Sequence, residues 1–187
     1  MIFLKKLILL PIQLLFSNDY LKERGIRTVE DERIDIVHSY LKGKTLDIGC
    51  GTHNYLIKKY KNGFGIDITF YRNNDLCASV ENLCFKDEKF ETVAIIGTLD
   101  YFDNKEKALR EINRVLKKEG QLIVTTLNPM IAKIRYTLAI WKKYGMPNRP
   151  GFWKKELLTL LDNFNFKLHL HKSFILGLNN IYIFVKK

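Results

Sequence analysis

LDIGCGTHNY, residues 46–55, joins a short apolar run to an aspartate and to two glycines that stand one residue apart. Residues 45–48 predict a short buried strand, and residues 53–61 predict a helix that begins directly after the glycines. A glycine turn at this point lets a ligand approach the backbone, and the first turn of the helix offers unpaired N–H groups to an anion. The stretch therefore predicts a ligand site at the carboxyl end of a sheet.

A second acidic residue, Asp67, lies near the end of the next predicted strand, GFGIDI, residues 63–68. It follows Asp47 by twenty residues, and a carboxylate at the end of a second strand can accept hydrogen bonds from both hydroxyls of a ribose. The pair therefore predicts a cofactor that contains adenosine. Two cofactors fit this geometry. One is a nicotinamide dinucleotide, whose G-x-G-x-x-G motif would have Asn54 as its last position, and the other is S-adenosylmethionine.

The composition is that of a globular protein. The chain has 187 residues with 47% apolar side chains, which is enough for one domain with its own core. Its three cysteines form no C-x-x-C pair and no zinc-type cluster with histidine, so we predict reduced thiols and no metal site. The net charge of +11 favours an anionic partner, but lysines spread along the chain are equally typical of an ordinary basic surface.

Strand-like and helix-like segments alternate along the chain, which predicts an α/β fold with a mostly parallel sheet. The spacing of Thr28 and Asp31, and of Asp103 and Glu106, indicates helix starts, and glycines indicate the ends of these helices at residues 43 and 120. A further helix is predicted for residues 153–163, and residues 130–150 are ambiguous. The expected strands are residues 45–48, 63–68, 76–78, 91–97, 121–127, 166–171 and 181–185.

Residues 1–25 form an apolar and basic segment ahead of the domain that we assign to residues 26–187. The apolar run of residues 1–16 is shorter than the roughly 20 residues that cross a bilayer, and no small-x-small cleavage site follows it. Two interpretations are open: a helix that caps the core of the domain, or a peripheral membrane anchor with Lys5 and Lys6 at the headgroups. We expect a cytoplasmic protein, either free or at the inner face of the membrane.

Three stretches follow one another in a specific order and spacing: LDIGCGT, GFGIDI and ENLCFKDEKFETVAIIGTLDYFDNKEKALREINRVLKKEGQLIVTT. Together they resemble the class I S-adenosylmethionine-dependent methyltransferases, in particular the type-11-like methyltransferase domain, over residues 34–127. The resemblance implies a Rossmann-like fold with a seven-stranded sheet, helices on both faces, and an antiparallel strand placed last. It also implies S-adenosylmethionine as the cofactor and methyl transfer as the reaction.

The same resemblance implies roles for particular residues. The glycine turn would lie along the methionine part of the cofactor, the acid after the second strand would hold the ribose, and residues 81–83 would lie near the adenine. The end of the fourth strand would line the other side. In chain order, the implied cofactor contacts are Asp47, Gly49, Cys50, Gly51, Asp67, Ile68, Asn82, Leu83, Gly97 and Thr98. We interpret the cysteine among them as a small filler of the turn.

The sequence departs from the family pattern at four places. His53 stands where a third glycine is usual, which would narrow the freedom of the turn. Ser79 stands where an acid often contacts the adenine, and Glu91 replaces an aspartate at what we interpret as a structural position. The connector between the second and third strands is short, so Phe70 and Tyr71 are expected to cover the cofactor instead.

The acceptor side offers two candidate catalytic residues. In methyl transfer the protein mainly supplies position and electrostatics, and a hydroxyl acceptor gains from a nearby general base. After the fourth strand, where relatives often place a histidine, this chain has Asp100 and Tyr101, which we take as candidates. The alternative is that Asp100 caps a turn and that Tyr101 packs.

Residues 129–153 mix apolar, aromatic and basic side chains and add to the apolar N-terminal run. This mixture favours a small-molecule or lipid-linked acceptor, including anionic ones, and membrane contact through residues 1–16. Nucleic acid ranks lower because no RNA-binding module is appended. Two other hypotheses are kept: a non-catalytic adaptor that binds an anionic partner, and a nicotinamide-dependent oxidoreductase, which Asn54 disfavours. The sequence predicts no oligomeric state.

Overall fold

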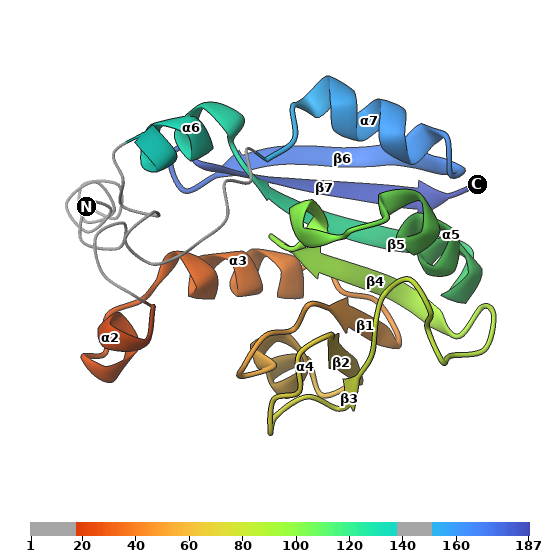
Figure 1. Cartoon of the computed structure of the whole chain (residues 1–187), viewed down its shortest axis with the longest axis horizontal. Coiled ribbons are helices and arrows are strands. Elements are labelled where there is room, and N and C mark those ends of the chain that lie inside the picture. Colours follow the sequence, from red (N-terminus) through yellow and green to blue (C-terminus); the bar gives the residue numbers. More distant parts are fainter. Residues whose placement is uncertain (1–17, 138–150) are drawn as a thin grey trace.

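The computed structural model of the chain describes residues 18–137 and 151–187, and its centre is a seven-stranded sheet (Figure 1). The strand order is β3-β2-β1-β4-β5-β7-β6, and β7 runs antiparallel to both of its neighbours while the other pairs are parallel. This confirms the predicted Rossmann-like class I methyltransferase fold. The strands are β1 (Thr45–Ile48), β2 (Gly63–Asp67), β3 (Leu76–Cys77), β4 (Phe90–Ile96), β5 (Leu116–Leu127), β6 (Phe166–Phe174) and β7 (Asn179–Lys186).

Helices cover both faces of the sheet, as predicted. Buried side chains of α3 and α4 pack with Ala94 and Ile123 on one face, and those of α5 and α7 pack with Val93 and Leu122 on the other. Neighbouring residues of each central strand therefore contribute to opposite faces. The helices are α2 (Asn18–Glu23), α3 (Val29–His38), α4 (Tyr55–Tyr60), the short 3-10 helix η1 (Leu99–Tyr101), α5 (Lys105–Val115), α6 (Pro129–Thr137) and α7 (Lys154–Asp162).

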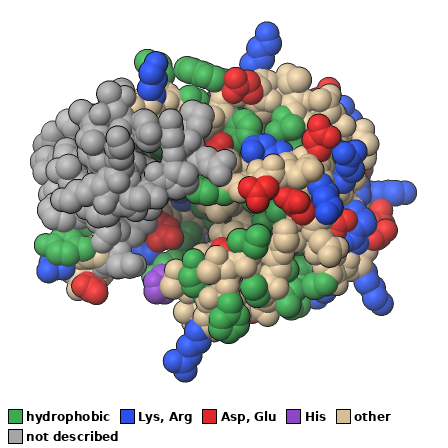
Figure 2. Space-filling model, viewed as in Figure 1, with side chains coloured by type: hydrophobic (Ala, Val, Ile, Leu, Met, Phe, Trp, Pro, Cys, Tyr) green, Lys and Arg blue, Asp and Glu red, His purple; other side chains and the backbone are tan. Residues whose placement is uncertain are grey.

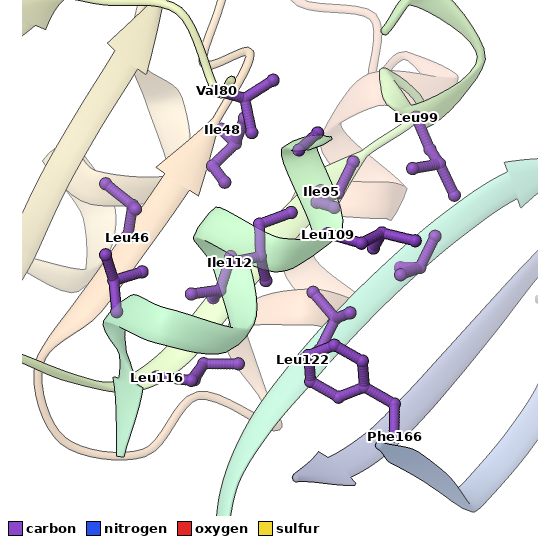
Figure 3. Packing of buried hydrophobic residues seen from close by; sticks show 14 of the residues in the cluster. Leu46, Ile48, Val80, Ile95, Leu99, Leu109, Ile112, Leu116, Leu122 and Phe166 are labelled. Carbon is purple, nitrogen blue, oxygen red and sulfur yellow. The ribbon is translucent and has the colours of Figure 1, made fainter. Parts of the chain in front are cut away.

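The larger core cluster lies between the sheet and α5. Figure 3 shows Leu109 and Ile112 of the helix pointing toward Ile95 and Leu122 of the central strands. All four side chains are fully buried, and each contributes roughly 1.5–3 kcal/mol to folding. This core fixes the carboxyl ends of β1 and β4, where the predicted ligand site lies.

The bounds of α5 correct two sequence predictions. Its N-cap is Asn104, not Asp103, because the Asn104 side chain accepts a hydrogen bond from the N–H of Lys107 at 2.9 Å. The helix ends at Val115 and not at Gly120. Leu116 instead pairs with Phe90 as the first residue of β5, and its burial there outweighs the helical pattern of the preceding residues.

The two helices that flank β1 are shorter than predicted. Thr28 and Asp31 form the predicted capping box at the start of α3, but this helix ends at His38 and not near Gly43. Residues 51–54 form turns, so α4 begins at Tyr55. The ligand turn is therefore longer than the sequence indicated.

Glu91 has the structural role that the sequence predicted. One carboxylate oxygen accepts the N–H of Lys44 at 2.6 Å, and the other pairs with the ammonium of Lys117. These two contacts join the start of β1 to the start of β5, at the edge of the sheet opposite the glycine turn. The aspartate that is usual here would have a shorter reach.

Part of the N-terminal segment packs on the domain. Leu21 of α2 is fully buried, and the ammonium of Lys22 lies 3.6 Å from the ring centre of Tyr55 and 2.5 Å from a Glu30 carboxylate oxygen. Residues 1–17 lie outside the described residues, so the cap and anchor interpretations of residues 1–16 stay predictions. Within residues 18–137 and 151–187, no helix is both long and apolar enough to span a membrane.

Candidate active site

The glycine turn after β1 is held closely against β2 and β4. The N–H groups of Gly49 and Cys50 both donate to the carbonyl of Ile66, at 2.8 and 3.0 Å. Gly49 has a φ of +75°, and a Cβ there would lie 2.6 Å from the side chain of Thr98. The Thr98 hydroxyl in turn donates to the carbonyl of Ile48 at 3.0 Å. Only glycine fits this position, because Thr98 fills the space that a Cβ would take, and Gly49 also lines a cavity.

Asp67 lies at the end of β2 and faces the same turn. One carboxylate oxygen accepts the N–H of Gly51 and the other accepts the N–H of Thr69, both at 3.0 Å. The side chain is half-buried and lines a cavity, and each carboxylate oxygen has a second acceptor site. The acid lies at the end of the second strand as the sequence predicted, and its contact with ribose hydroxyls stays a prediction.

Asp47 is a buried carboxyl group with an unused acceptor. Its side chain is 3% exposed, and its Oδ1 atom has no hydrogen-bond partner among the described residues. Burial and the nearby charge of Asp67 raise the pKa of Asp47 to about 7. Such a group is suited to meet a cationic ligand group, because a positive charge would compensate for the burial of the carboxylate.

A network behind the turn centres on Asn54, which the sequence did not single out as a site residue. Asn54 is buried with a φ of 49°, and its side-chain amide donates to the carbonyl of Asn73 at 3.1 Å and to Asp75 at 3.0 Å. Asp75 also accepts the N–H of Gly65 at 2.7 Å, and a Cβ on Gly65 would lie 2.1 Å from the Asn54 side chain. The signal was present, since asparagine tolerates the left-handed conformation better than most residues.

The departure at His53 does not strain the turn. The positive φ angles fall on Gly49, Gly51 and Asn54, and His53 has none. The His53 ring packs against the ring of Tyr55, with 4.8 Å between the ring centres. Asn54 therefore takes the backbone conformation for which a glycine would otherwise be needed.

A cavity of about 290 Å³ opens beside the turn, over the carboxyl ends of β1, β2 and β4. Gly49, Asp67, Ile68 and Thr98, all predicted cofactor contacts, line it together with the candidate Tyr101. The complete lining is Ile48, Gly49, Ile66, Asp67, Ile68, Ala78, Ser79, Val80, Glu81, Thr98, Tyr101, Phe102 and Asp103. Of residues 81–83, which were predicted at the adenine, only Glu81 lines the cavity, and Ser79 and Val80 line it beside Glu81.

Two predicted adenine contacts lie elsewhere. Leu83 is buried in the larger core, and its N–H donates to Glu111 of α5 at 2.8 Å. Asn82 is exposed, and its N–H donates to the carbonyl of Ser79 at 3.2 Å. Neither residue lines the cavity. Ser79 and Glu81 line the cavity instead, and the Glu81 carboxylate also accepts the N–H of Asn104 at 2.9 Å.

Four other predicted contacts lie around the turn without lining the cavity: Asp47, Cys50, Gly51 and Gly97. Burial and three neighbouring carboxylates raise the pKa of the Cys50 thiol to about 12, which fits its predicted role as a small filler. In the described part of the chain, no group of three or more His, Cys, Asp or Glu side chains is placed to hold a metal ion.

On the acceptor side, the structure separates the two candidates. Tyr101 is 41% exposed and lines the cavity, and its N–H donates to the carbonyl of Thr98 at 2.9 Å. Asp100 precedes it in η1 and does not line the cavity. Phe70 and Tyr71 do not line the cavity either, so the expected cover over the cofactor is absent from these residues, and Ile68 stands at the rim instead.

The residues present fit S-adenosylmethionine. A backbone cradle with no room for a Cβ, a half-buried acid at the second strand, and a buried acid with an unused oxygen match a small ligand with hydroxyl and ammonium groups. Together with the strand order, this site defines a nucleotide-binding domain of the class I methyltransferase type.

Comparison with known proteins finds that residues 46–124 match the methyltransferase domain model, so this part of the chain is similar to methyltransferase domains. An S-adenosylmethionine-dependent methyltransferase of Thermotoga maritima has a similar structure, with a TM-score of 0.70 at 23% identity over 83% of this chain and 88% of that one. At this identity the structural likeness supports the fold.

Curated relatives match part of the chain. They include an uncharacterised Methanocaldococcus jannaschii protein (36% identical over 126 residues, 61% of this chain and 46% of that protein). The human "Probable tRNA methyltransferase 9B" is 36% identical over 90 residues, 42% of this chain and 20% of that protein. The ubiquinone/menaquinone biosynthesis C-methyltransferase of Hahella chejuensis is 36% identical over 75 residues, 38% and 28%. The chain spans 40 to 46% of the three M. jannaschii relatives that it matches.

Proposed function

We propose that the protein is an enzyme that transfers a methyl group from S-adenosylmethionine to a small-molecule or lipid-linked acceptor. The observation that carries the proposal is the cavity formed by the glycine turn, Asp67 and Thr98 at the carboxyl ends of β1, β2 and β4. The methyltransferase domain match over residues 46–124 includes the glycine turn, Asp67 and Thr98.

The chemistry requires little from the chain beyond positioning. S-adenosylmethionine supplies an activated methyl group, which an acceptor takes up by in-line displacement. Asp67 would hold the ribose, Asp47 would face the ammonium of the methionine part, and the backbone at Gly49 would let it approach. Tyr101 would contact the acceptor, because it lines the cavity and its phenol group can donate or accept a hydrogen bond there.

Exposed apolar side chains support a small or lipid-linked acceptor. Ile68, which lines the cavity, is 71% exposed, and Phe70 is 78% exposed. Met130 and Trp153, in the apolar and basic segment of residues 129–153, are 61% and 53% exposed. Residues 138–150 of that segment lie outside the described residues. The H. chejuensis relative, whose name refers to ubiquinone and menaquinone, belongs to the same acceptor class.

RNA is the second candidate acceptor, and the relative named as a tRNA methyltransferase favours it. On the one face that Figure 2 shows, Lys and Arg side chains project from several edges and lie among acidic side chains. RNA binding generally uses a continuous basic face. We therefore rank RNA behind a small or lipid-linked acceptor.

The first test is calorimetric titration with S-adenosylmethionine and with S-adenosylhomocysteine. Micromolar affinity is expected for the wild type and its loss for Asp67→Ala, with Asp162→Ala as a control for the loss of an exposed acid remote from the cavity. If the wild type fails to bind either compound at millimolar concentration, the enzyme proposal is overturned and the adaptor hypothesis takes its place.

The acceptor is tested by transfer of labelled methyl groups from S-adenosylmethionine to a lipid extract, a small-molecule extract and total RNA. Label in the first two pools would support the proposal, and label confined to RNA would overturn its acceptor class. Location at the inner face of the membrane is tested by sedimentation with anionic vesicles. If residues 1–17 are an anchor, the full chain should sediment with the vesicles and the chain without these residues should not. If the segment is a cap, neither form should sediment with them.

A further inference from the structure

Arg33 is an arginine on the buried stripe of α3. Val29 and Val37 stand four residues before and after it, and both are buried against the domain, so Arg33 shares their side of the helix. Its Nε atom donates to the side-chain oxygen of Asn179 at 2.8 Å. Among the described residues its two Nη atoms have no hydrogen-bond partner and it forms no ion pair, which leaves most of its donors unused.

Two further polar groups near Arg33 are unused. The side-chain nitrogen of Asn179 and the hydroxyl oxygen of Thr125 are buried without a hydrogen-bond partner among the described residues. Thr125 follows Ile123 by two residues and Asn179 precedes Ile181 by two, so both share the sheet face covered by α3. A buried polar group without a partner is costly, so two such groups beside an arginine with unused donors call for a ligand that accepts hydrogen bonds.

The cluster of Arg33, Thr125 and Asn179 adjoins the cavity but belongs to the other half of the sheet. Arg33 Nη1 would lie 3.4 Å from a Cβ built on Gly97, and the N–H of Gly97 donates to the carbonyl of Thr125 at 3.1 Å. The cavity lies over β2, β1 and β4, whereas the cluster lies at the ends of β4, β5 and β7. Gly97 and Thr98 are therefore the boundary between the two.

The acidic neighbour of Arg33 is already engaged. Glu30 is near enough to influence the guanidinium, but a carboxylate oxygen of Glu30 is 2.5 Å from the ammonium of Lys22. Burial lowers the pKa of Arg33, because the guanidinium has lost part of its contact with water. The phenol of Tyr101, which lines the cavity, is also within electrostatic range. A negative charge brought in by a ligand would stabilise this guanidinium.

We propose that Arg33, Thr125 and Asn179 form the anion-recognition half of the acceptor site, and that the acceptor carries a carboxylate or phosphate group. The proposal rests on the proposed methyltransferase function and adds the charge of its substrate. The paired Nη atoms of an arginine match the two oxygens of a carboxylate, and the amide of Asn179 and hydroxyl of Thr125 add donors beside them. An acceptor held there would extend past Gly97 toward Tyr101 and the cavity.

The test uses charged and neutral probes of one shape: benzoate, phenyl phosphate and benzamide. Saturation-transfer NMR detects their binding to the full chain, loaded with S-adenosylhomocysteine. The variants are Arg33→Met, which keeps the apolar stem, and Arg33→Lys, which keeps the charge but loses the fork. Arg110→Met removes an exposed arginine of α5 and is the matched control. Thermal unfolding of each variant confirms folding before the probes are added.

We expect benzoate or phenyl phosphate, but not benzamide, to bind the wild type and the control. The affinity of the anion should fall at least tenfold in Arg33→Met and less in Arg33→Lys. Equal binding of benzoate and benzamide, or full anion binding by Arg33→Met, would overturn the proposal. A tenfold loss of S-adenosylhomocysteine affinity in Arg33→Met would also overturn it, because Arg33 would then serve the cofactor. Failure of the wild type to bind S-adenosylhomocysteine is a separate result, which overturns the proposed function.

Discussion

Asp47 is a residue whose protonation is coupled to folding. Its folded-state pKa of about 7 lies above its ordinary value of 3.8, so the folded chain binds the proton more tightly than the unfolded chain does. The free energy of unfolding therefore falls as the pH rises from about 4 to about 7, by roughly 1.4 kcal/mol per unit of pKa difference at most. Above that window, the wild type carries the full cost of a buried carboxylate.

Asp47→Asn should remove this dependence. Without cofactor, the variant is expected to gain stability relative to the wild type between about pH 5 and about pH 8, because only the wild type acquires a buried charge. Urea unfolding at the two pH values measures the difference, and Asp162→Asn, on the surface, is the control. A difference between wild type and variant that is constant with pH would contradict the assigned pKa.

Gly49 and Gly51 offer a matched pair of substitutions. Both have positive φ angles, but a Cβ would overlap the Thr98 side chain at Gly49 and meet nothing within 4 Å at Gly51. Gly51→Ala should cost about 1–2 kcal/mol through backbone strain alone, and Gly49→Ala should cost more because Thr98 must also move. Urea unfolding midpoints measure this order, and equal costs would show that Thr98 yields freely.

At the scale of elements, Arg114 of α5 binds the loop of residues 83–87, which follows the cavity residues Ser79 to Glu81. Its guanidinium donates to the carbonyls of Leu83 and Phe85 at 2.9 and 2.7 Å, and to carboxylates of Asp87 and Glu111 at 2.8 and 2.7 Å. Glu111 in turn accepts the N–H of Leu83. The helix thus holds three residues of the loop before β4 in place.

Arg114→Met should cost about 2–4 kcal/mol, because it leaves two carbonyls and a half-buried carboxylate without their donor. It should also weaken S-adenosylhomocysteine binding, since the loop leads directly from Ser79 and Glu81 at the cavity. Unfolding and calorimetry measure the two effects. Arg110→Met, in an exposed pair with Glu106, should change stability by less than about 0.5 kcal/mol. Unchanged binding in Arg114→Met would show that the loop holds its shape alone.

The elements show which features a sequence pattern can predict. The strand centres and the capping box at Thr28 follow from local patterns, and the structure places them as predicted. Gly49 and Asp67 lie at the ends of β1 and β2 as expected, and their cofactor roles stay predictions. The end of α5 does not follow from a local pattern, because the pairing of Leu116 with Phe90 is a long-range contact that replaces helix by strand. Leu83 was likewise misplaced because its N–H bonds to Glu111 across the fold.

On the scale of the whole molecule, the sequence predicted the seven-stranded sheet but could not predict the proposed anion-recognition cluster. The cluster of Arg33, Thr125 and Asn179 draws its members from a helix and two strands that meet only in the fold. A charged residue on the apolar stripe of α3, between Val29 and Val37, was the one local signal of it. Recognising the partners required the order of β4, β5 and β7.

Like β4 and β5, β7 contributes side chains to both cores. Ile181 and Ile183 pack under α3, whereas Tyr182 and Phe184 pack in the cluster under α5 and α7. β7 inserts between β5 and β6, and β4 and β5 separate it from β1. If the sheet unfolds as one cooperative unit, a loss of packing in β7 affects the glycine turn only by lowering the free energy of global unfolding.

Phe184→Ala should therefore lower the global free energy of unfolding by about 3–5 kcal/mol, since the side chain is fully buried. Native-state hydrogen exchange should accelerate at the amides of Leu46 and Ile48 by the same free energy as at the amides of β7. Lys187→Ala, which removes an exposed ion pair with Asp162, is the control and should alter neither. Exchange that accelerates in β6 and β7 but not in β1 would show that these two strands open independently of β1. The cluster of Arg33, Thr125 and Asn179 would then open while the cavity beside the glycine turn keeps its shape.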